Sequence, residues 1–384
     1  MDPTDTPLVA PDPGPFRMGG FLRRPRAGSA RRPAGSTRRS AADGRRSFAM
    51  TFLAVAVVAA FLSPLVRSLT LSIKTPQQVS AVDAPLWPES PVTFTYRDRD
   101  YGLYVVPLPD GSTRQLALVR KGLTQSSFAD PSDPAVQTDA LITWVGPWRA
   151  LQPVKVLDPH FENYANVWNE INYPRLLFNT IAIALIGMIG TVVSCTLVAY
   201  GFARFRFPGR NLLFLLVIAT IFLPSVVTTI PTYTLFLKIG WVGTWLPLII
   251  PAFFANAYDV FLLRQYLLTI PREMDEAAAI DGAGPFRTLV SVIIPQAWPV
   301  IGAVAIFHLV YTWNDFFGPL IYLSGSPDLQ TVAVGLASFS GARVALDPGL
   351  IQAATLMTLV IPVAIFLVFQ RVFVRGIVIT GVEK

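Results

Sequence analysis

The chain has 384 residues, of which 52% are hydrophobic and 14% charged, and its formal net charge is +7. A soluble domain usually carries about 25% charged residues, so this composition excludes an ordinary water-soluble protein and indicates a protein embedded in lipid. The positive charge does not indicate nucleic-acid binding, because ten of the arginines lie within residues 1–47, where membrane orientation explains them. The single cysteine, Cys195, excludes a disulfide within the chain.

Long uncharged runs predict membrane-spanning helices. Residues 1–47 are rich in Arg, Pro, Gly, Ser and Ala, and such a segment buries too little apolar surface to order itself, so we predict a disordered basic cytoplasmic tail. The first transmembrane helix is predicted over 48–73. Five further runs each supply the roughly 20 apolar residues that a span needs: 176–203, 211–237, 239–258, 288–314 and 348–370. The sequence therefore predicts an all-α integral membrane protein with six transmembrane helices.

Residues 74–163 differ from the rest in being polar, proline-rich and aromatic. Two apolar-leaning stretches within 101–122 flank a Pro-Asp-Gly turn at 109–111, which predicts a β-hairpin. The segment 142–148 predicts a further strand. Because isolated hairpins are marginally stable in water, we expect this small β-rich insert to pack on the outer mouth of the membrane domain.

The placement of lysine and arginine predicts the orientation. The N-terminal tail, the link 204–210 and the C-terminal tail are each rich in arginine, whereas 74–173 carries eight basic and eleven acidic residues. We therefore predict that both termini lie in the cytoplasm and that the insert is extracytoplasmic.

The chain lacks the residues that would power transport. No Gly-x-x-x-x-Gly-Lys-Ser/Thr loop is present, so ATP hydrolysis is not expected within this chain. Ion-driven carriers usually place ionisable groups at mid-membrane, but His308 is the only titratable side chain expected deep in a span. We predict no catalytic residues, no metal site and no cofactor, and expect the energy to come from another protein.

Residues 264–295 interrupt the apolar spans with a short charged helix. Pro271 can begin a helix, acidic residues suit its first turns, and an alanine run follows. Gly282 and Gly284 then end it, and Pro285 begins a second helix. The alanines leave a smooth surface that another protein can approach closely.

This segment resembles the cytoplasmic loop of ABC importer permeases, whose pattern is Glu-Ala-Ala, three residues, Gly, nine residues, then Ile-x-Leu-Pro. Here residues 276–278 are Glu-Ala-Ala, Gly282 has the required spacing, and 292–295 read Val-Ile-Ile-Pro, with two mild replacements. Other stretches resemble the carbohydrate, maltose-permease-like branch of that family: 161–168, 176–184, 312–323, 331–341 and 369–384. The resemblance covers roughly 50–73 and 160–384, but not the tail or most of the insert.

The resemblance implies a type I importer permease fold, with a five-helix permease core over 164–384 and a coupling loop over 264–290. It also implies a second homologous permease, two cytoplasmic ATPase subunits and an extracytoplasmic solute-binding protein as partners, in a bacterial plasma membrane. In this reading the chain forms half of a translocation pathway for sugars. The residues that would form the ATPase-coupling loop are Glu276, Ala277, Ala278, Asp281, Gly282 and Pro295.

The residues that contact the solute are predicted only by type, because sugars are held by aromatic faces and by amide or hydroxyl hydrogen bonds. The candidates are Tyr233, Asn256, Tyr258, Trp313 and Asn314. The alternative for each is a structural role, since aromatic residues gather at membrane interfaces and polar ones bridge helices. Three other functions stay open: a permease for a non-sugar solute, a self-sufficient secondary carrier, and a membrane-anchored signalling protein.

Overall fold

The computed structural model describes residues 41–81, 84–132, 141–343 and 347–378. Two compact units, residues 1–59 and 60–384, make up the chain. Most of the predicted disordered tail lies outside the described residues, but its last part is helical, because helix α1 (Ala41–Ser72) begins before the predicted end of the tail. Alanine and arginine are strong helix formers, which explains why the helix extends beyond the apolar run.

Helices account for most of the described chain. In chain order they are α1 (Ala41–Ser72), α2 (Pro76–Ser80), α3 (Glu162–Glu170), α4 (Tyr173–Arg204), α5 (Arg210–Ala219), α6 (Ser225–Lys238), α7 (Leu246–Ile249), α8 (Ala257–Thr269), α9 (Glu273–Ile280), α10 (Pro285–Thr288), α11 (Ile294–Asn314), α12 (Phe317–Leu323), α13 (Val332–Arg343) and α14 (Pro348–Val378).

Within the described residues, five helical segments are long and apolar enough to cross a membrane. They are Ser47–Ser72, Tyr173–Arg204, Leu246–Thr269, Pro285–Asn314 and Pro348–Gln370. A sixth span is present if Arg210–Phe222 and Val226–Lys238 count as one, although these two segments are bent by 99°. The prediction of an all-α membrane protein of about six spans is therefore confirmed.

Two predicted spans differ from the structure. The run 211–237 is not one straight helix, because Pro224 stands at the bend as the residue that precedes α6.

The span predicted at 239–258 lies instead at Leu246–Thr269 and includes two charged residues. Asp259 accepts a hydrogen bond from the side chain of Asn256, at 2.6 Å, and the Arg264 guanidinium lies 4.0 Å from the centre of the Phe214 ring. These contacts give both charges a partner inside the span. A search for uncharged runs ends the predicted span at residue 258 and therefore misses the part that contains Asp259 and Arg264.

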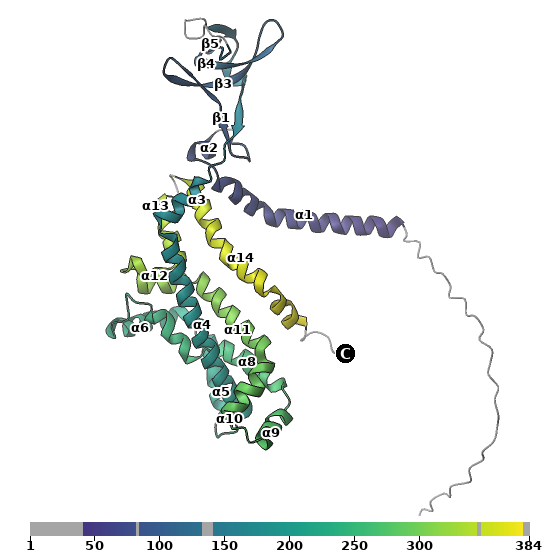
Figure 1. Ribbon diagram of the computed structural model, residues 1–384, viewed down its shortest axis with the longest axis vertical. Helices are drawn as coiled ribbons and strands as arrows, with labels where there is room; N and C mark the ends of the chain where they lie inside the picture. Colours follow the sequence, from purple (N-terminus) through teal and green to yellow (C-terminus); the bar gives the residue numbers. More distant parts are fainter. Residues whose placement is uncertain (1–40, 82–83, 133–140, 344–346, 379–384) are drawn as a thin grey trace, which may run out of the picture. The chain divides into compact units, whose positions relative to one another are not determined.

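The core of the helical region lies between α4, α8 and α11 (Figure 1). Its fully buried members include Ala199, Leu263 and Val304, one from each helix. Two glycines let other elements approach α4 closely. A Cβ atom at Gly187 would lie 2.6 Å from Nε2 of His308, and one at Gly190 would lie 2.6 Å from the Phe253 ring. A side chain at either position therefore requires His308 or Phe253 to move.

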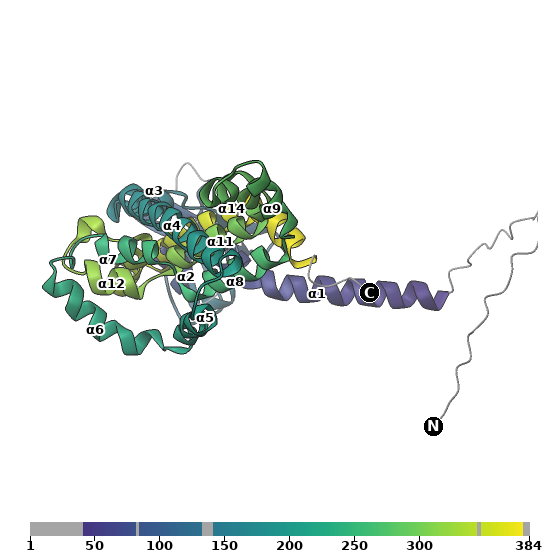
Figure 2. The same ribbon diagram turned by 90° about the horizontal axis from the view of Figure 1, so that it is seen from below.

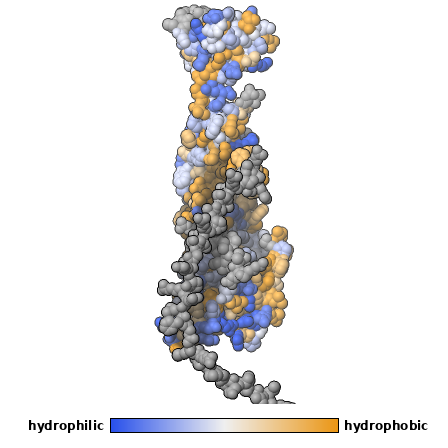
Figure 3. All heavy atoms as spheres, turned by 90° about the vertical axis from the view of Figure 1, so that its right-hand side faces the viewer, coloured by the Kyte–Doolittle hydropathy of each residue, from blue (hydrophilic) through white to orange (hydrophobic). Residues whose placement is uncertain are grey.

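Helix α6 lies at the periphery of the bundle in both ribbon views (Figures 1 and 2). Most of its large apolar side chains are strongly exposed, with Val226 at 79% and Ile230 at 74%, whereas Phe236 is buried. On the face drawn in Figure 3, hydrophobic patches lie along the visible side of the helical part, and hydrophilic residues gather at its lower end. Such a distribution is expected where apolar helices face lipid or another apolar protein surface.

The insert between α2 and α3 is a small sheet domain, so the prediction of a β-rich insert is confirmed. Its strands are β1 (Glu89–Pro91), β2 (Thr93–Tyr96), β3 (Arg99–Pro107), β4 (Thr113–Arg120), β5 (Gln125–Ala129), β6 (Ile142–Val145), β7 (Gln152–Pro153) and β8 (Lys155–Leu157). Strands β2 to β6 pair in chain order, β7 pairs with β3, and β1 pairs separately with β8. All described pairings are antiparallel.

The predicted hairpin is β3–β4, and its turn contains Gly111 at a φ of +82°, which glycine adopts without strain. The sheet has its own hydrophobic core on both faces. Leu103 and Ala117 belong to one buried cluster, and Leu116 and Phe128 to the other. Both clusters consist of residues of the insert itself. The sheet therefore does not depend on the membrane helices for its core, because six strands bury apolar surface between them. That the insert packs on the outer mouth of the membrane domain stays a prediction.

A polar junction joins the insert to the helices. The side chain of Asn163 at the start of α3 donates to the backbone oxygens of Ser72, at 2.9 Å, and Lys74, at 3.1 Å. Beside it, His160 contacts the carboxylates of Glu162 and Asp158.

The hydrogen bond with Glu162 is the main cause that raises the pKa of His160. The hydrogen bond with Ser90 is the main cause that lowers the pKa of Asp158, and the bond with His160 lowers that of Glu162. A protonated His160 stabilises the junction fully below about pH 6.5, and this stabilisation is lost as the pH rises through the raised folded-state pKa. The carboxylates contribute above about pH 4 and lose their contribution as the pH falls through their lowered values.

Replacing Gly190 with valine is expected to destabilise the protein by about 1–3 kcal/mol, because the added atoms would overlap the Phe253 ring. Thermal unfolding in detergent measures the effect. The matched control is Gly201→Val on the same helix, where a Cβ would meet no atom within 4 Å. Equal loss of stability in the two variants would contradict the close packing at Gly190.

Candidate functional site

The loop between α8 and α11 is held against the C-terminal end of α4. The Arg204 side chain is only 7% exposed, and its Nη2 donates to the backbone oxygen of Ile270 at 3.0 Å. Its Nε lies 3.3 Å from Oδ2 of Asp275 in α9 and forms an ion pair without the alignment of a hydrogen bond. On the other side of the loop, the Tyr200 hydroxyl donates to the backbone oxygen of Pro285 at 3.2 Å. Two residues one helical turn apart on α4 therefore fix both ends of the loop.

Within this loop, α9 ends in a closed turn. The amide of Gly282 donates to the Ala279 oxygen at 3.0 Å, and the amide of Ala283 donates to the Ala278 oxygen at 2.9 Å. This is the Schellman arrangement of hydrogen bonds, which needs a left-handed residue after the helix. Gly282 supplies it with a φ of +78°. The position therefore tolerates a side chain only at a cost in backbone strain.

The outer face of the loop mixes acidic and apolar side chains. Ala278 is buried, at 8% exposure, whereas Glu276, Ala277 and Asp281 are exposed. Two large apolar residues flank the turn, with Ile280 at 87% and Phe286 at 72% exposure. The structure thus brings five of the six predicted coupling residues into one segment, and it adds two apolar side chains to the same exposed turn.

The sixth residue, Pro295, lies beyond this turn as the second residue of α11, after a π-helical turn over Leu289–Ile293. A proline here cannot donate to the carbonyl of Ser291, and its ring would clash with that carbonyl in a regular α-helix. A wider turn relieves the clash. Pro295 therefore shapes the entry to α11 and lies outside the exposed turn at Gly282, although its own side chain is exposed.

Sequence reasoning missed the residues that hold the loop in place. The sequence indicates only membrane orientation for Arg204 and a helix start for the acidic residues that include Asp275. Their contact joins residues 71 positions apart in the sequence, and no spacing rule identifies such a pair. The only signal was an arginine at the end of a predicted span, followed later in the chain by an acidic helix on the same side of the membrane.

The five predicted solute-contact residues lie in separate places. Tyr233 of α6 stacks on Tyr322 of α12, with ring centres 6.2 Å apart. Trp313 is buried at the end of α11, while the amide of Asn314 donates back to the Val310 oxygen of the same helix at 2.8 Å. The structure does not gather these three side chains with the other two.

Asn256 and Tyr258 lie at the start of α8. The Asn256 side chain accepts from the Asp259 amide at 2.9 Å and donates to the Asp259 carboxylate, so it caps the helix. Tyr258 is 56% exposed and lies beside Phe307 of α11. Two of the five predicted residues, Tyr233 and Tyr258, have a described aromatic neighbour, and of these two Tyr258 is the more exposed.

Polar residues of α4 face the break before α8, where Ala255 has a φ of +53°. The Ser194 hydroxyl accepts from the Ala255 amide at 3.1 Å and donates to the Ala252 oxygen at 3.2 Å. Thr191 bonds His308 of α11 at 3.0 Å. A pocket of about 410 Å³ lies beside this break and is lined in part by Ser194 and Ala255. None of the five predicted solute-contact residues lines it.

Sequence comparison identifies similar proteins. Residues 190–379 match the family described as the binding-protein-dependent transport system inner membrane component. The osmoprotective compounds uptake permease protein GgtD of Synechocystis sp. is 31% identical over 60% of this chain and 78% of its own length. The sn-glycerol-3-phosphate transport system permease protein UgpE of Rhizobium meliloti is 34% identical over 55% of this chain and 74% of its own.

Comparison with solved structures identifies the same fold. A chain of a bacterial ABC transporter involved in the import of the acidic polysaccharide alginate aligns with a TM-score of 0.59. The alignment covers 86% of this chain and 98% of that one, at 18% identity. The fold of the described helices is therefore that of an ABC importer membrane subunit.

Replacing Asp275 with asparagine is expected to loosen the loop, because it leaves the nearly buried Arg204 guanidinium without its counter-charge. The partial exposure of Asp275 limits the cost to about 2 kcal/mol. Hydrogen exchange of residues 270–283 should therefore accelerate by roughly 30-fold, while exchange in α4 and α11 stays slow. Glu273→Gln, at an exposed acid of the same helix, is the control. Unchanged exchange in Asp275→Asn would refute the clamp.

Proposed function

The chain belongs to the binding-protein-dependent transport system inner membrane component family, and from this we propose that it draws energy from a separate ATPase through the α9–α10 loop. It is a membrane-spanning permease subunit of such an importer. One observation carries the proposal: an exposed helical turn with acidic and apolar side chains is fixed to a spanning helix at both of its ends. A loop held in this way can pass a displacement to the membrane helices.

In this mechanism two ATPase subunits bind on the cytoplasmic side, one on this chain and one on a second, homologous permease. Ile280 and Phe286 enter an apolar cleft of the ATPase, and Glu276 supplies a charged contact at its edge. Closure of the ATPases around nucleotide moves the loops. Because Arg204 and Tyr200 fix the loop to α4, the motion reaches the core as a rigid-body shift between two access states.

The other partners follow from surfaces of the same chain. The exposed apolar face of α6 supports a second permease or lipid as its neighbour. The insert supports a role in contact with the solute-binding protein, since it is a separately packed domain. The arginines of the N-terminal tail and of the link 204–210 support cytoplasmic termini and an extracytoplasmic insert.

We assign the solute to the sugars, on the basis of the carbohydrate-branch stretches at 312–323 and 331–341. A second candidate, a polyol phosphate, is favoured by a relative that is named for sn-glycerol 3-phosphate. Among the predicted contacts, Tyr258 has the best support, because its exposed ring offers an apolar face to a sugar.

Glu276→Lys and Gly282→Pro are each expected to abolish solute uptake while the protein stays in the membrane. Charge reversal would place an unpaired or repelled charge in the interface, which costs several kcal/mol. Proline cannot adopt the positive φ of residue 282. Uptake and co-purification of the ATPase are the two measurements.

Two controls sharpen this test. Gly282→Ala keeps the amide and introduces only the strain of a left-handed alanine, about 1–2 kcal/mol, so it should reduce ATPase retention only partly. Lys238→Glu reverses a charge outside the loop and should leave retention unchanged. Normal uptake with normal ATPase retention in both Glu276→Lys and Gly282→Pro would rule out the coupling role.

The solute class predicts a competition result. With the full transporter in proteoliposomes, unlabelled maltose-type sugars should inhibit uptake of the labelled native solute more strongly than sn-glycerol 3-phosphate does. Tyr258→Ala should weaken the sugar competition by up to about 10-fold, since a contact with one aromatic ring contributes roughly 0.5–1.5 kcal/mol. Tyr258→Phe, which keeps the ring, should preserve it. Stronger competition by sn-glycerol 3-phosphate would favour the second candidate.

A further inference from the structure

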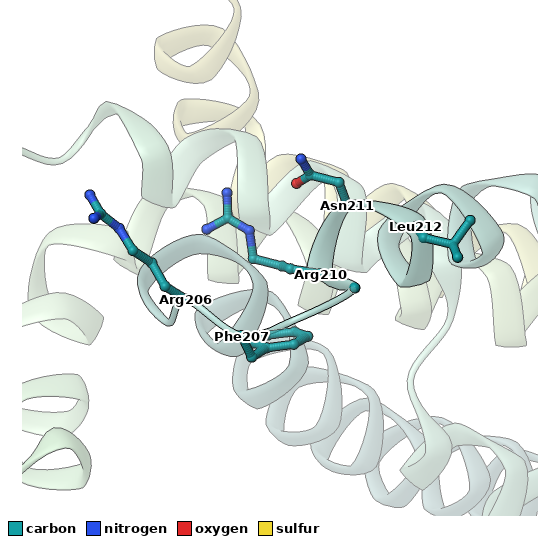
Figure 4. A pocket seen from close by; sticks show the side chains of 6 residues that line it. Arg206, Phe207, Arg210, Asn211 and Leu212 are labelled. Atoms are coloured by element: carbon teal, nitrogen blue, oxygen red, sulfur yellow. The ribbon is translucent and has the colours of Figure 1, made fainter.

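A basic pocket lies between the end of α4 and the start of α5. It has a volume of about 350 Å³ and is lined by Arg206, Phe207, Gly209, Arg210, Asn211 and Leu212. In Figure 4 the side chains of Arg206, Arg210 and Asn211 extend to the same side of the link. Gly209 has a φ of +76°, so a left-handed residue turns the chain sharply into α5. The pocket is therefore formed by a short, tightly turned segment.

The charges in this pocket have no acidic counterpart in the described part of the chain. Arg210 donates one bond, to the backbone oxygen of Phe205 at 3.2 Å. Arg206 has no described ion pair, and Arg264 lies within electrostatic reach of Arg210. By contrast, the neighbouring Arg204 is neutralised by Asp275 at 3.3 Å. The segment thus holds uncompensated positive charge, to which the N-terminal end of the α5 dipole adds.

An apolar face continues directly from this pocket. Leu212 lines the pocket and is also 62% exposed. Leu215 is 62% and Leu216 is 56% exposed. These three leucines are spaced i, i+3 and i+4, so they form one stripe on α5. A ligand with an anionic head and a hydrocarbon chain would match the pocket and the stripe together.

We propose that this pocket binds the phosphate headgroup of an anionic membrane lipid, with an acyl chain along the leucine stripe of α5. Arginine and asparagine donate to phosphate oxygens, and two guanidinium groups neutralise the charge. A free phosphate would use the same donors but would leave the leucines without a role. The inference needs only that this end of α4 lie at a membrane surface, so it does not depend on the coupling loop or on the solute.

The test is native mass spectrometry of the full-length chain purified in detergent, titrated with phosphatidylglycerol or phosphatidylcholine. We expect one saturable phosphatidylglycerol that phosphatidylcholine does not replace. Each arginine near an anionic headgroup contributes roughly a fivefold gain in affinity, so Arg206→Gln combined with Arg210→Gln should weaken binding by roughly 25-fold. The double variant with lysine at both positions keeps the charge and should bind within a few-fold of the native chain.

Arg287→Gln is the matched control, because Arg287 is an exposed arginine of the neighbouring α10 and lies outside the pocket. It should bind lipid as the native chain does. Thermal unfolding verifies that each variant is folded. A folded double glutamine variant with unchanged affinity would overturn the proposal, as would equal binding of phosphatidylcholine.

Soluble competitors separate the two sources of phosphate. Millimolar inorganic phosphate and the deacylated phosphatidylglycerol headgroup should not displace the lipid, because neither can occupy the leucine stripe. Leu212→Asn combined with Leu216→Asn should weaken lipid binding. The lipid that still binds to this variant should also resist displacement by inorganic phosphate. Displacement of the lipid by inorganic phosphate would overturn the lipid assignment and indicate a site for a soluble anion.

Discussion

Backbone polar groups within a membrane protein must find partners inside the protein, and helix α4 supplies many of them. Its Ser194 hydroxyl satisfies the chain break before α8. Nearer its start, the amide of Asn179 donates to the backbone oxygens of Asp328, at 2.9 Å, and Gln330, at 2.8 Å. The Thr180 hydroxyl accepts from the amide of Val332 at 2.9 Å. Irregular segments at several depths therefore depend on one continuous helix, as the absence of water in hydrocarbon requires.

Because several segments are bonded to α4, a movement at one end of this helix can reach segments that are attached elsewhere along it. The same helix packs closely against its neighbours at Gly187 and Gly190 and holds the α9–α10 loop through Arg204 and Tyr200. Interior packing at native density resists gradual deformation. A displacement of the loop therefore moves α4 with its attached segments, which fits a switch between two discrete arrangements better than a continuous change.

Elements with strong local signals could be predicted from the sequence. The α9 helix and its glycine stop follow from propensity and capping, and the β3–β4 hairpin follows from its Pro-Asp-Gly turn. Elements decided by distant contacts could not be predicted in this way. The span that contains Asp259 and Arg264 extended past its uncharged run because Asn256 and Phe214 partner these charges. The clamp on the loop, and the insert's own two-sided core, likewise depend on residues far apart in the chain.

The pairing of β1 with β8 has a consequence for the order of biosynthesis. It joins residues 89–91 to residues 155–157, so the ends of the insert come together only after nearly all of it has left the ribosome. Helix α4 begins shortly afterwards, at Tyr173. Since domains generally fold as units during synthesis, the insert can complete its strand pairing before the membrane-spanning helices that follow it are available. A chain arrested at that stage would hold one anchored helix and an insert whose two hydrophobic clusters are already complete.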